Sequence, residues 1–379
     1  MIQFFLGLVS FLVLSFIFFL IVKVSSKYEK RNFWLGLLFT IIIVQFFKWA
    51  FIDLTRVPTG SMEKTLIPGD FVLVSKLHYG LRTPSTLLQI PLTHQKTRFF
   101  EFTSYLDWIQ IPFFRLPGFS RVKRNDAVVF NAPIEPDIPM DVRTFYVKRC
   151  IGLPGDFISM HEGKYIVNKE NIVDAPSKMY EYVVKTNEML HKDWFKKYNV
   201  TEYVIAGENL YIIRLLVKNN IPQILEDIEN DISVVSVKMR SIDPENEFVF
   251  VRNFDNYIDL SNWGGEEGIL VPKRSSKIKL TKENVNRYWD YIKSECGKDI
   301  ELINGSEVYF KGKKIDEYEF KYDYYFMIGD NIYGSFDSRY WGFVREDEIY
   351  AKALLVVFSK GLDSLFSGLK FRFLKTMWS

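Results

Sequence analysis

Two short segments far apart in the chain carry residues that could act together as a nucleophile and a base. Residues 57–64 place Ser61 directly after Gly60. Residues 144–151 alternate apolar and polar side chains as a β-strand does, with Lys148 at the centre. A serine hydroxyl needs a base to become a good nucleophile, and a lysine can be that base only when burial keeps its amine neutral. If the two residues meet, they could attack a carbonyl carbon.

A third segment supplies residues that could orient such a pair. Ser335 could hydrogen-bond a neutral lysine amine and direct its lone pair. Asp337 and Arg339 lie two residues apart, so in an extended segment they project to one side and can pair to brace the loop. Thr59, two residues before Ser61, could donate its hydroxyl to a developing oxyanion beside the backbone N–H groups of the turn.

Lys64 is a competing base, because Ser61 and Lys64 also fit the S-x-x-K motif of penicillin-binding proteins and class A β-lactamases. In those enzymes the serine opens a helix, and the lysine follows one turn later. Here Pro68 and Gly69 would interrupt that helix early, and the companion S-D-N and K-T-G motifs are missing from the sequence. The 4 histidines have no metal-ligand spacing, so neither a metal site nor a histidine triad is expected.

The chain begins with two apolar segments, each long enough to cross a bilayer. Ile2 to Val24 has no charge before Lys23, and a second run covers residues 33–52. The connector between them is basic, whereas the N-terminal flank is uncharged, so the positive-inside rule places the connector in the cytoplasm and the rest of the chain outside. A cleaved signal peptide is the alternative, but the first run lacks the basic flank and the small-x-small cleavage site.

The remaining sequence predicts a mainly β fold: an antiparallel β-sheet catalytic domain with a long α/β insertion. Strands are expected at 71–74, 127–130, 144–151 and 353–358, and helices of the insertion near 187–198, 220–230 and 281–294. The predicted organisation is a transmembrane helix (1–24), a cytoplasmic loop (25–32), a second transmembrane helix (33–54), a β core in two parts (55–159 and 299–358), an inserted domain (160–298) and an amphipathic tail (359–379).

Composition adds a few constraints. The formal net charge of +3 gives no reason to expect a nucleic-acid partner. Aromatic residues make up 17% of the chain, which fits contact with lipid. The aromatic-rich segment 82–120 and the tail could rest on the membrane surface, although packing on the domain explains the aromatic residues of 82–120 equally well. Cys150 and Cys296 are expected to be free core residues.

The three segments together resemble the bacterial type I signal peptidases, membrane-bound Ser/Lys endopeptidases that remove signal peptides from exported proteins. The resemblance covers about 55–85, 121–159 and 320–358, together with the two apolar spans. The matching residues are Pro58-Thr-Gly-Ser61-Met62, Pro68-Gly-Asp70 with Val74-Ser-Lys76, Arg124-Asn-Asp126 with Val128-Val-Phe130, Tyr146-Val-Lys148-Arg149 with Gly152-Leu-Pro-Gly-Asp156, and Gly329-Asp-Asn331 with Ser335, Asp337, Arg339 and Trp341-Gly-Phe-Val344.

The resemblance implies a role for each candidate residue. Ser61 would be the nucleophile and Lys148 the general base, with Thr59 and Ser61 at the oxyanion, Ser335 orienting the lysine, and Asp337 and Arg339 bracing the site. The pocket for the small side chains at −1 and −3 of the substrate would be lined by Met62, Leu66, Tyr146 and Val147. The resemblance implies no cofactor. It implies an inner-membrane protein with a periplasmic catalytic domain, whose partners are signal peptides, the lipid bilayer and possible contacts with the secretion machinery.

One segment departs from the family pattern. After Gly329-Asp-Asn331 the family has a polar, Asn-containing link before the serine, whereas this chain has Ile332-Tyr-Gly334. This departure leaves the local shape of the loop open. The role of the inserted domain (160–298) is open as well. A non-catalytic chaperone or scaffold of the secretion pathway, built on the same β domain, is the alternative function. A distance near 3 Å between Ser61 Oγ and Lys148 Nζ would support the enzymatic one.

Overall fold

The computed structural model describes residues 51–360, except 84, 90–94, 96–102, 136, 162–163 and 240–267, together with 369–370 and 375–376. Nearly all of the two apolar segments predicted to span the membrane therefore lies outside the described residues. Within the described part, no helix has both the length and the apolar character needed to cross a bilayer.

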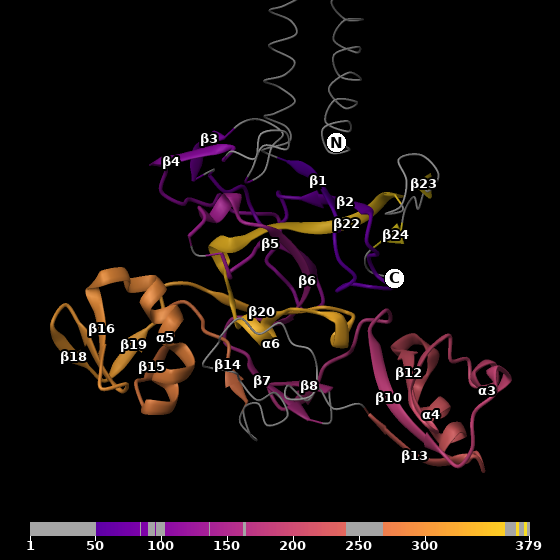
Figure 1. Ribbon diagram of the computed structural model, residues 1–379. Helices are drawn as coiled ribbons and strands as arrows, with labels where there is room; N and C mark the ends of the chain where they lie inside the picture. The colour runs from indigo at the N-terminus through magenta and orange to yellow at the C-terminus, as the bar shows by residue number, and fades with distance from the viewer. Residues whose placement is uncertain are drawn as a thin grey trace, which may run out of the picture.

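An antiparallel sheet forms the centre of the described structure, which confirms the mainly β prediction (Figure 1). Its strand order is β1-β2-β22-β5-β6-β20-β21. Every residue of β5 is buried, as expected of a strand inside a sheet that is covered on both faces. The strands are β1 (Ile52–Arg56), β2 (Asp70–Ser75), β5 (Ala127–Asn131), β6 (Phe145–Gly152), β20 (Tyr324–Ile328), β21 (Val344–Arg345) and β22 (Ile349–Lys360).

One predicted boundary is wrong at the start of this sheet. The second transmembrane helix was expected to reach residue 54, but Ile52 already pairs with Ser75, and β1 continues from there. Within the tail predicted at 359–379, β22 extends to Lys360, and β23 (Leu369–Lys370) and β24 (Lys375–Thr376) pair with it. At residue 52, hydrogen bonding to a strand that is distant in sequence overrides the local apolar pattern. The other tail residues from 361 onward lie outside the described part.

The segment 82–120, predicted to be loop-like, contains a two-stranded hairpin of β3 (Thr86–Gln89) and β4 (Tyr105–Gln110). Several of its large apolar side chains are exposed, with Trp108 at 74% and Phe119 at 83%. Packing on the domain therefore does not account for these two residues. Contact of this segment with lipid stays a prediction.

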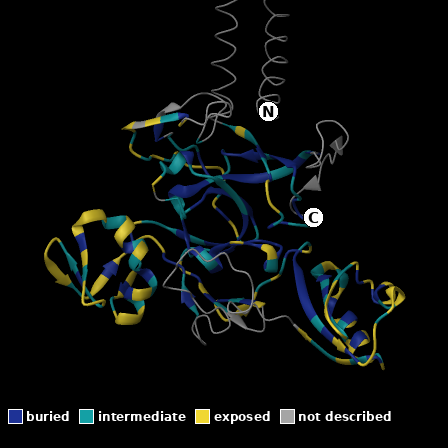
Figure 2. Ribbon diagram, in the orientation of Figure 1, coloured by how far each residue is buried: buried dark blue, intermediate teal, exposed yellow. Residues whose placement is uncertain are grey.

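The insertion predicted at 160–298 begins as two strands and then forms a compact lobe, here called the first lobe (residues 179–239). Its sheet has the order β11-β12-β10-β13. Ile221, Ile224 and Ile228 form the buried stripe of α4, at the helical spacing the sequence predicts. The elements are β10 (Met179–Thr186), α3 (Lys192–Lys197), β11 (Glu202–Gly207), β12 (Leu210–Leu216), α4 (Ile221–Glu229) and β13 (Val234–Met239). Figure 2 shows the buried residues concentrated on β10 and on the inner face of α4.

A second lobe (residues 277–319) surrounds α5 (Lys282–Cys296) on the opposite side of the molecule (Figure 1). The hydroxyl of Thr281 caps this helix by accepting from Asn284 N at 3.3 Å, and Val285 and Ile292 lie on its buried face. The predicted boundary at residue 298 falls inside this lobe, because β16 (Ile300–Ile303), β17 (Glu307–Phe310), β18 (Lys313–Ile315) and β19 (Glu317–Glu319) continue it. The three predicted helices are confirmed as α3, α4 and α5.

A small sheet connects the β core to the insertion. It has the order β14-β7-β8-β9, and Ile158 of β7 packs in the same apolar cluster as the second lobe. The strands are β7 (Phe157–His161), β8 (Lys164–Val167), β9 (Glu170–Asn171) and β14 (Ile269–Leu270).

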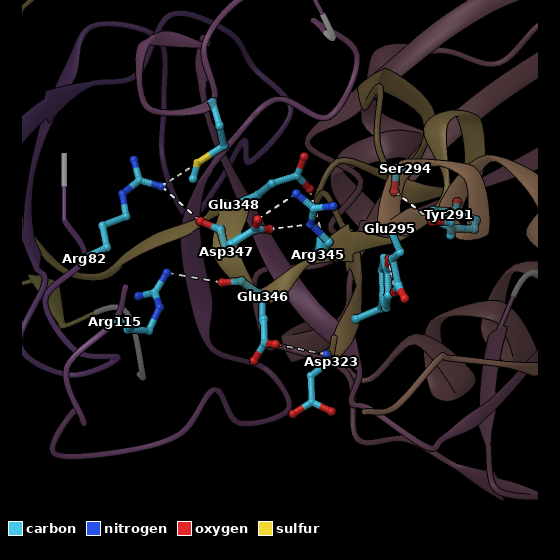
Figure 3. Close-up of polar contacts among 12 residues, drawn as sticks. Arg82, Arg115, Tyr291, Ser294, Glu295, Asp323, Arg345, Glu346, Asp347 and Glu348 are labelled. Carbon is cyan, nitrogen blue, oxygen red and sulfur yellow. Dashed lines mark hydrogen bonds and ion pairs between the residues drawn. The ribbon is translucent and has the colours of Figure 1, made fainter. Parts of the chain in front are cut away.

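Charged residues fix the turn that leads into β22 (Figure 3). The turn is the 3-10 helix η5 (Glu346–Glu348). Arg82 Nη1 donates to the carbonyl of Asp347 at 3.3 Å, and Arg115 Nη2 donates to the carbonyl of Glu346 at 3.2 Å. Arg345 pairs with the Asp347 carboxylate at 2.6 Å. The start of the central strand β22 is thereby tied to the segment 82–120.

Candidate active site

The predicted nucleophile lies in a tight turn directly after β1. Ser61 is 8% exposed, whereas Thr59 is exposed. The turn is closed by Glu63 N donating to Gly60 O at 3.0 Å and by Leu66 N donating to Met62 O at 2.6 Å. The Thr59 and Ser61 hydroxyl oxygens lie 3.5 Å apart. The structure thus brings together the two hydroxyl groups that the sequence assigned to nucleophile and oxyanion.

The predicted base, Lys148, lies inside the central sheet. It pairs with Val128 of β5 and is 4% exposed. Within the described part of the chain it forms no ion pair. Burial lowers the pKa of Lys148 to about 8; the carboxylates of Asp337 and Asp330 oppose this shift, and the positive charge of Arg339 adds to it. A large fraction of this amine is therefore neutral slightly above neutral pH.

Gly329, the residue after β20, is where the three candidate segments converge. The antiparallel register of β6 and β20 ends with Ile328 opposite Arg149, so its continuation by one residue would bring Gly329 opposite Lys148. Opposite positions project to the same face of a sheet. A Cβ at Gly329 would lie 2.2 Å from Ser335 Oγ and 2.5 Å from the carbonyl oxygen of Ser61. The Ser335 hydroxyl and the Ser61 turn are therefore neighbours at Gly329, and the continued register directs the Lys148 side chain toward the same face.

Ser335 and Lys148 do not form the hydrogen bond between hydroxyl and amine that the sequence suggested. Ser335 is 5% exposed, and its Oγ has no hydrogen-bond partner among the described residues. Ser61 Oγ is likewise hydrogen-bonded within the described part only to Thr59 Oγ1, so the direct Ser61–Lys148 hydrogen bond is not formed. Catalytic hydrogen bonds are often long in the absence of substrate. The structure brings these groups together without pairing them.

Asp337 and Arg339 pair as the sequence predicted, but not in an extended segment. Asp337 is the N-cap of α6 (Ser338–Trp341), and Arg339 lies in the helix. Arg339 Nε and Nη2 donate to the Asp337 carboxylate at 2.7 and 2.9 Å, and Gly329 N donates to the same carboxylate at 3.0 Å. Burial alone would raise the pKa of Asp337, but the charge and hydrogen bonds of Arg339 hold that pKa below its ordinary value.

The four predicted pocket residues divide between two apolar clusters. Met62 and Leu66 are fully buried, and Val147 packs against the cluster that contains them. Tyr146 packs against a different cluster, because neighbouring residues of a strand point to opposite faces. Its ring centroid lies 5.9 Å from Lys148 Nζ. A single pocket lined by all four residues stays a prediction.

Arg149 and Asp330 lie in the segments that resemble the family, next to candidate residues, and the structure joins them in a buried ion pair that the sequence did not predict. Arg149 Nε and Nη2 donate to the Asp330 carboxylate at 2.7 and 2.6 Å. Thr65 Oγ1 donates to the same carboxylate at 2.5 Å. The nucleophile turn, the lysine strand and the end of β20 are thus held by one carboxylate. The only signal in the sequence was the adjacency of Arg149 to Lys148 and of Asp330 to Gly329.

Lys64, the alternative base, is engaged elsewhere. It has φ 70°, outside helical conformation, and its ammonium group pairs with Glu202 of the first lobe. A helix that would place Lys64 one turn after Ser61 is therefore not formed. This geometry argues against the S-x-x-K interpretation.

The chain belongs to the signal peptidase, peptidase S26 family, whose sequence profile matches residues 30–358. It is therefore a serine endopeptidase, and the resemblance read from the three sequence segments is confirmed. The match spans both lobes as well as the β core.

Individual relatives are similar over different lengths. Signal peptidase I of Buchnera aphidicola subsp. Baizongia pistaciae is 25% identical over 321 residues, which cover 84% of this chain and 74% of that protein. Signal peptidase I of Pseudomonas aeruginosa is 31% identical over 149 residues, which cover 39% of each chain. Signal peptidase I of Rickettsia akari is 31% identical over 149 residues, which cover 39% of this chain and 46% of that protein.

Proposed function

We propose that this peptidase removes signal peptides from exported preproteins by cleaving after a small-x-small motif, with Ser61 as nucleophile and Lys148 as general base. The relatives named Signal peptidase I support this substrate class. One observation carries the choice of base: Lys148 is buried without an ion pair in the described part of the chain, and its pKa is lowered to about 8. Its strand pairs with β20, at whose end Ser335 and the Ser61 turn meet.

In the proposed mechanism, the neutral amine of Lys148 takes the Ser61 hydroxyl proton as Oγ attacks the scissile carbonyl carbon. The oxyanion of the tetrahedral intermediate accepts hydrogen bonds from Ser61 N–H and Thr59 Oγ1. Collapse of the intermediate breaks the C–N bond, and the Lys148 ammonium returns its proton to the leaving amine. Lys148 then removes a proton from a water molecule, which attacks the acyl carbon. The ester C–O bond breaks, and the Lys148 ammonium returns that proton to Ser61 Oγ, which restores the hydroxyl and the neutral amine.

The surrounding residues would prepare this chemistry. Ser335 would hydrogen-bond the neutral amine, while the buried Asp337–Arg339 pair fixes the loop on which Ser335 lies. The substrate would bind as an extended strand, with Met62, Leu66, Tyr146 and Val147 forming walls for its small side chains.

The proposed location is the inner membrane, with the catalytic domain in the periplasm. The apolar residues 2–24 and the run that starts at 33 would form a two-helix anchor that ends before β1. The bilayer and the signal peptide would then be partners of the domain, as would any secretion machinery that delivers the preprotein.

The test uses the full chain in detergent micelles and a preprotein as substrate. Ser61→Ala and Lys148→Ala should each lower the cleavage rate by on the order of 10³-fold or more. Lys64→Ala is the matched control and should stay within about threefold, because its half-exposed ion pair contributes little to stability. Unchanged cleavage by Ser61→Ala would refute the peptidase mechanism, and loss of cleavage in Lys64→Ala alone would reassign the base.

A further inference from the structure

The segment that departs from the family pattern is a point of contact between the first lobe and the candidate site, besides the Lys64–Glu202 ion pair. It forms the 3-10 helix η4 (Ile332–Gly334). Ile332 is 1% exposed and belongs to the apolar core of the first lobe, and Tyr333 packs against the same core. The Tyr333 hydroxyl donates to the carbonyl of Glu181 on β10 at 3.4 Å. Ile332 is thus part of the interior of the lobe, and the half-buried Tyr333 packs against it.

The backbone of the same loop is bonded to the site. Asn331 N donates to Ser61 O at 3.1 Å, and Asn331 forms a parallel bridge with Met179 at the start of β10. The carbonyl of Ile332 accepts from Arg339 Nη2. Arg339 Nη2 also donates to Ser335 O at 3.3 Å. The loop is therefore tied to the nucleophile turn at one end and to Ser335 at the other.

We propose that Ile332 and Tyr333 are positioning residues, which by packing into the first lobe hold Ser335 against Gly329 and beside Lys148. This gives the first lobe a role in the reaction, and it rests on the proposed function. Only Ile332, Tyr333 and Gly334 separate the Asn331 anchor from Ser335, so a shift of Ile332 is passed directly to the Ser335 hydroxyl. Displacements of about 1 Å in catalytic groups can lower rates by on the order of 10²-fold.

A second consequence concerns the base. Lys148 faces Asp337 and Arg339 from α6 and Asp330 from the end of β20, and burial is the largest influence on its proton. If the loop moves away, water reaches the amine and the Ser335 hydroxyl no longer lies next to it. Both changes favour the ammonium form, so the pH at which the base becomes active should rise.

The experiment compares two truncations in the same apolar cluster. Ile332→Ala removes the anchor, and Ile228→Ala removes an equally buried isoleucine of α4 that is not part of the loop. With the full chain in detergent, Ile332→Ala should lower kcat by about 10- to 100-fold, change KM by less than threefold and move the acid limb of the kcat/KM profile to higher pH. Ile228→Ala should lower the melting temperature similarly but leave kcat and the acid limb within about twofold of the parent.

The milder pair Ile332→Val and Ile228→Val serves if the alanine variants do not fold, with a threefold or larger loss of kcat expected only for Ile332→Val. Ile332→Leu should return the acid limb of the kcat/KM profile to its pH position in the parent protein. Equal effects at positions 332 and 228, or an unchanged acid limb in Ile332→Ala, would overturn the proposal. Failure of the proposed function is seen separately, as cleavage that survives Ser61→Ala.

Discussion

The space that a side chain at Gly329 would occupy is filled by the hydroxyl of Ser335. A Cβ built on Gly329 would lie 2.2 Å from Ser335 Oγ, far inside van der Waals contact. Ile328 lies opposite Arg149, and continuing this register brings Gly329 opposite Lys148, so the close approach places the serine on the side of the sheet toward which the lysine would project. Glycine is needed here for space, since Gly329 is not among the residues with positive φ.

Gly329→Ala should therefore lower the cleavage rate by about 100-fold or more, because Ser335 and the Ser61 carbonyl must move to admit the methyl group. Overpacking of this kind also costs roughly 1–3 kcal/mol of stability. The matched control is Gly207→Ala on β11, where the nearest atom to an added Cβ is 3.7 Å away. Full activity in Gly329→Ala, measured on a preprotein, would show that cleavage does not require the close approach of Ser335 to Gly329.

The pH dependence of cleavage should report the state of Lys148. The amine acts as a base only when neutral, so kcat/KM should rise with pH through a midpoint near 8, the value to which burial lowers its pKa. An exposed lysine would instead place that midpoint near 10.4. A profile that keeps rising to pH 10 would exclude Lys148 as the base.

The same burial should make Lys148 unfavourable for stability. Its pKa is lower in the folded than in the unfolded chain, so between about pH 8 and 10.5 the unfolded chain holds more protons, and stability rises with pH across this window. At pH 7 the folded protein bears the full cost of the buried charge. Lys148→Met should raise the free energy of unfolding at pH 7 by on the order of 2 kcal/mol, measured by urea denaturation. A decrease at pH 7 would contradict this assignment.

Asp330→Asn should be strongly destabilising. Arg149 would be left buried without a full countercharge, a change that typically costs about 3–5 kcal/mol. Glu319→Gln is the comparison, because the Lys277–Glu319 pair spans 3.8 Å at the surface and contributes less than about 1 kcal/mol. Denaturation midpoints of the two variants measure the difference, and equal midpoints would show that the buried pair does not hold the segments together.

Glu348, in the cluster of Figure 3, should make stability fall as pH rises. Burial, assisted by the charge of Asp347, raises the pKa of Glu348 to about 7. Between these values the folded chain retains a proton that the unfolded chain loses near pH 4.5. The free energy of unfolding that depends on this proton is therefore fully present below pH 4.5 and is lost as the pH rises through 7. In melting curves, the melting temperature of Glu348→Gln relative to that of the parent protein should be higher at pH 8 than at pH 5. An equal difference at both pH values would contradict the assignment.

Much of the β core was predictable, because its strands are short apolar runs bounded by turn residues. The run at 144–151 became β6, and Asp337 was expected to pair with Arg339, which follows two residues later. The Arg149–Asp330 pair was not predicted, because 181 residues separate its members and only the sheet register brings them together. Local spacing can suggest a pair only when both residues belong to the same segment.

Other errors have the same origin. Ile52 continues an apolar run, so the sequence alone favours helix, and its strand conformation depends on hydrogen bonds to β2. Ile332 and Tyr333 looked out of place in a polar loop, because the core that receives them is contributed by residues 180–228. In each case the deciding partner is absent from the local sequence.

The central strand β22 follows β1, β2, β5, β6, β20 and β21 in sequence, and only the two-residue strands β23 and β24 of this sheet come after it. It pairs with β2 through contacts such as Phe71 with Phe358, whose rings lie 4.4 Å apart, and with β5 through Ala351 and Val129. Roughly 200 residues lie between β6 and β22, and at about 5–20 residues per second their translation takes on the order of 10–40 s. During that interval the sheet that holds Ser61 near Lys148 is missing its middle. We therefore expect a nascent chain to lack the proposed peptidase activity until β22 has been synthesised and has paired with β2 and β5.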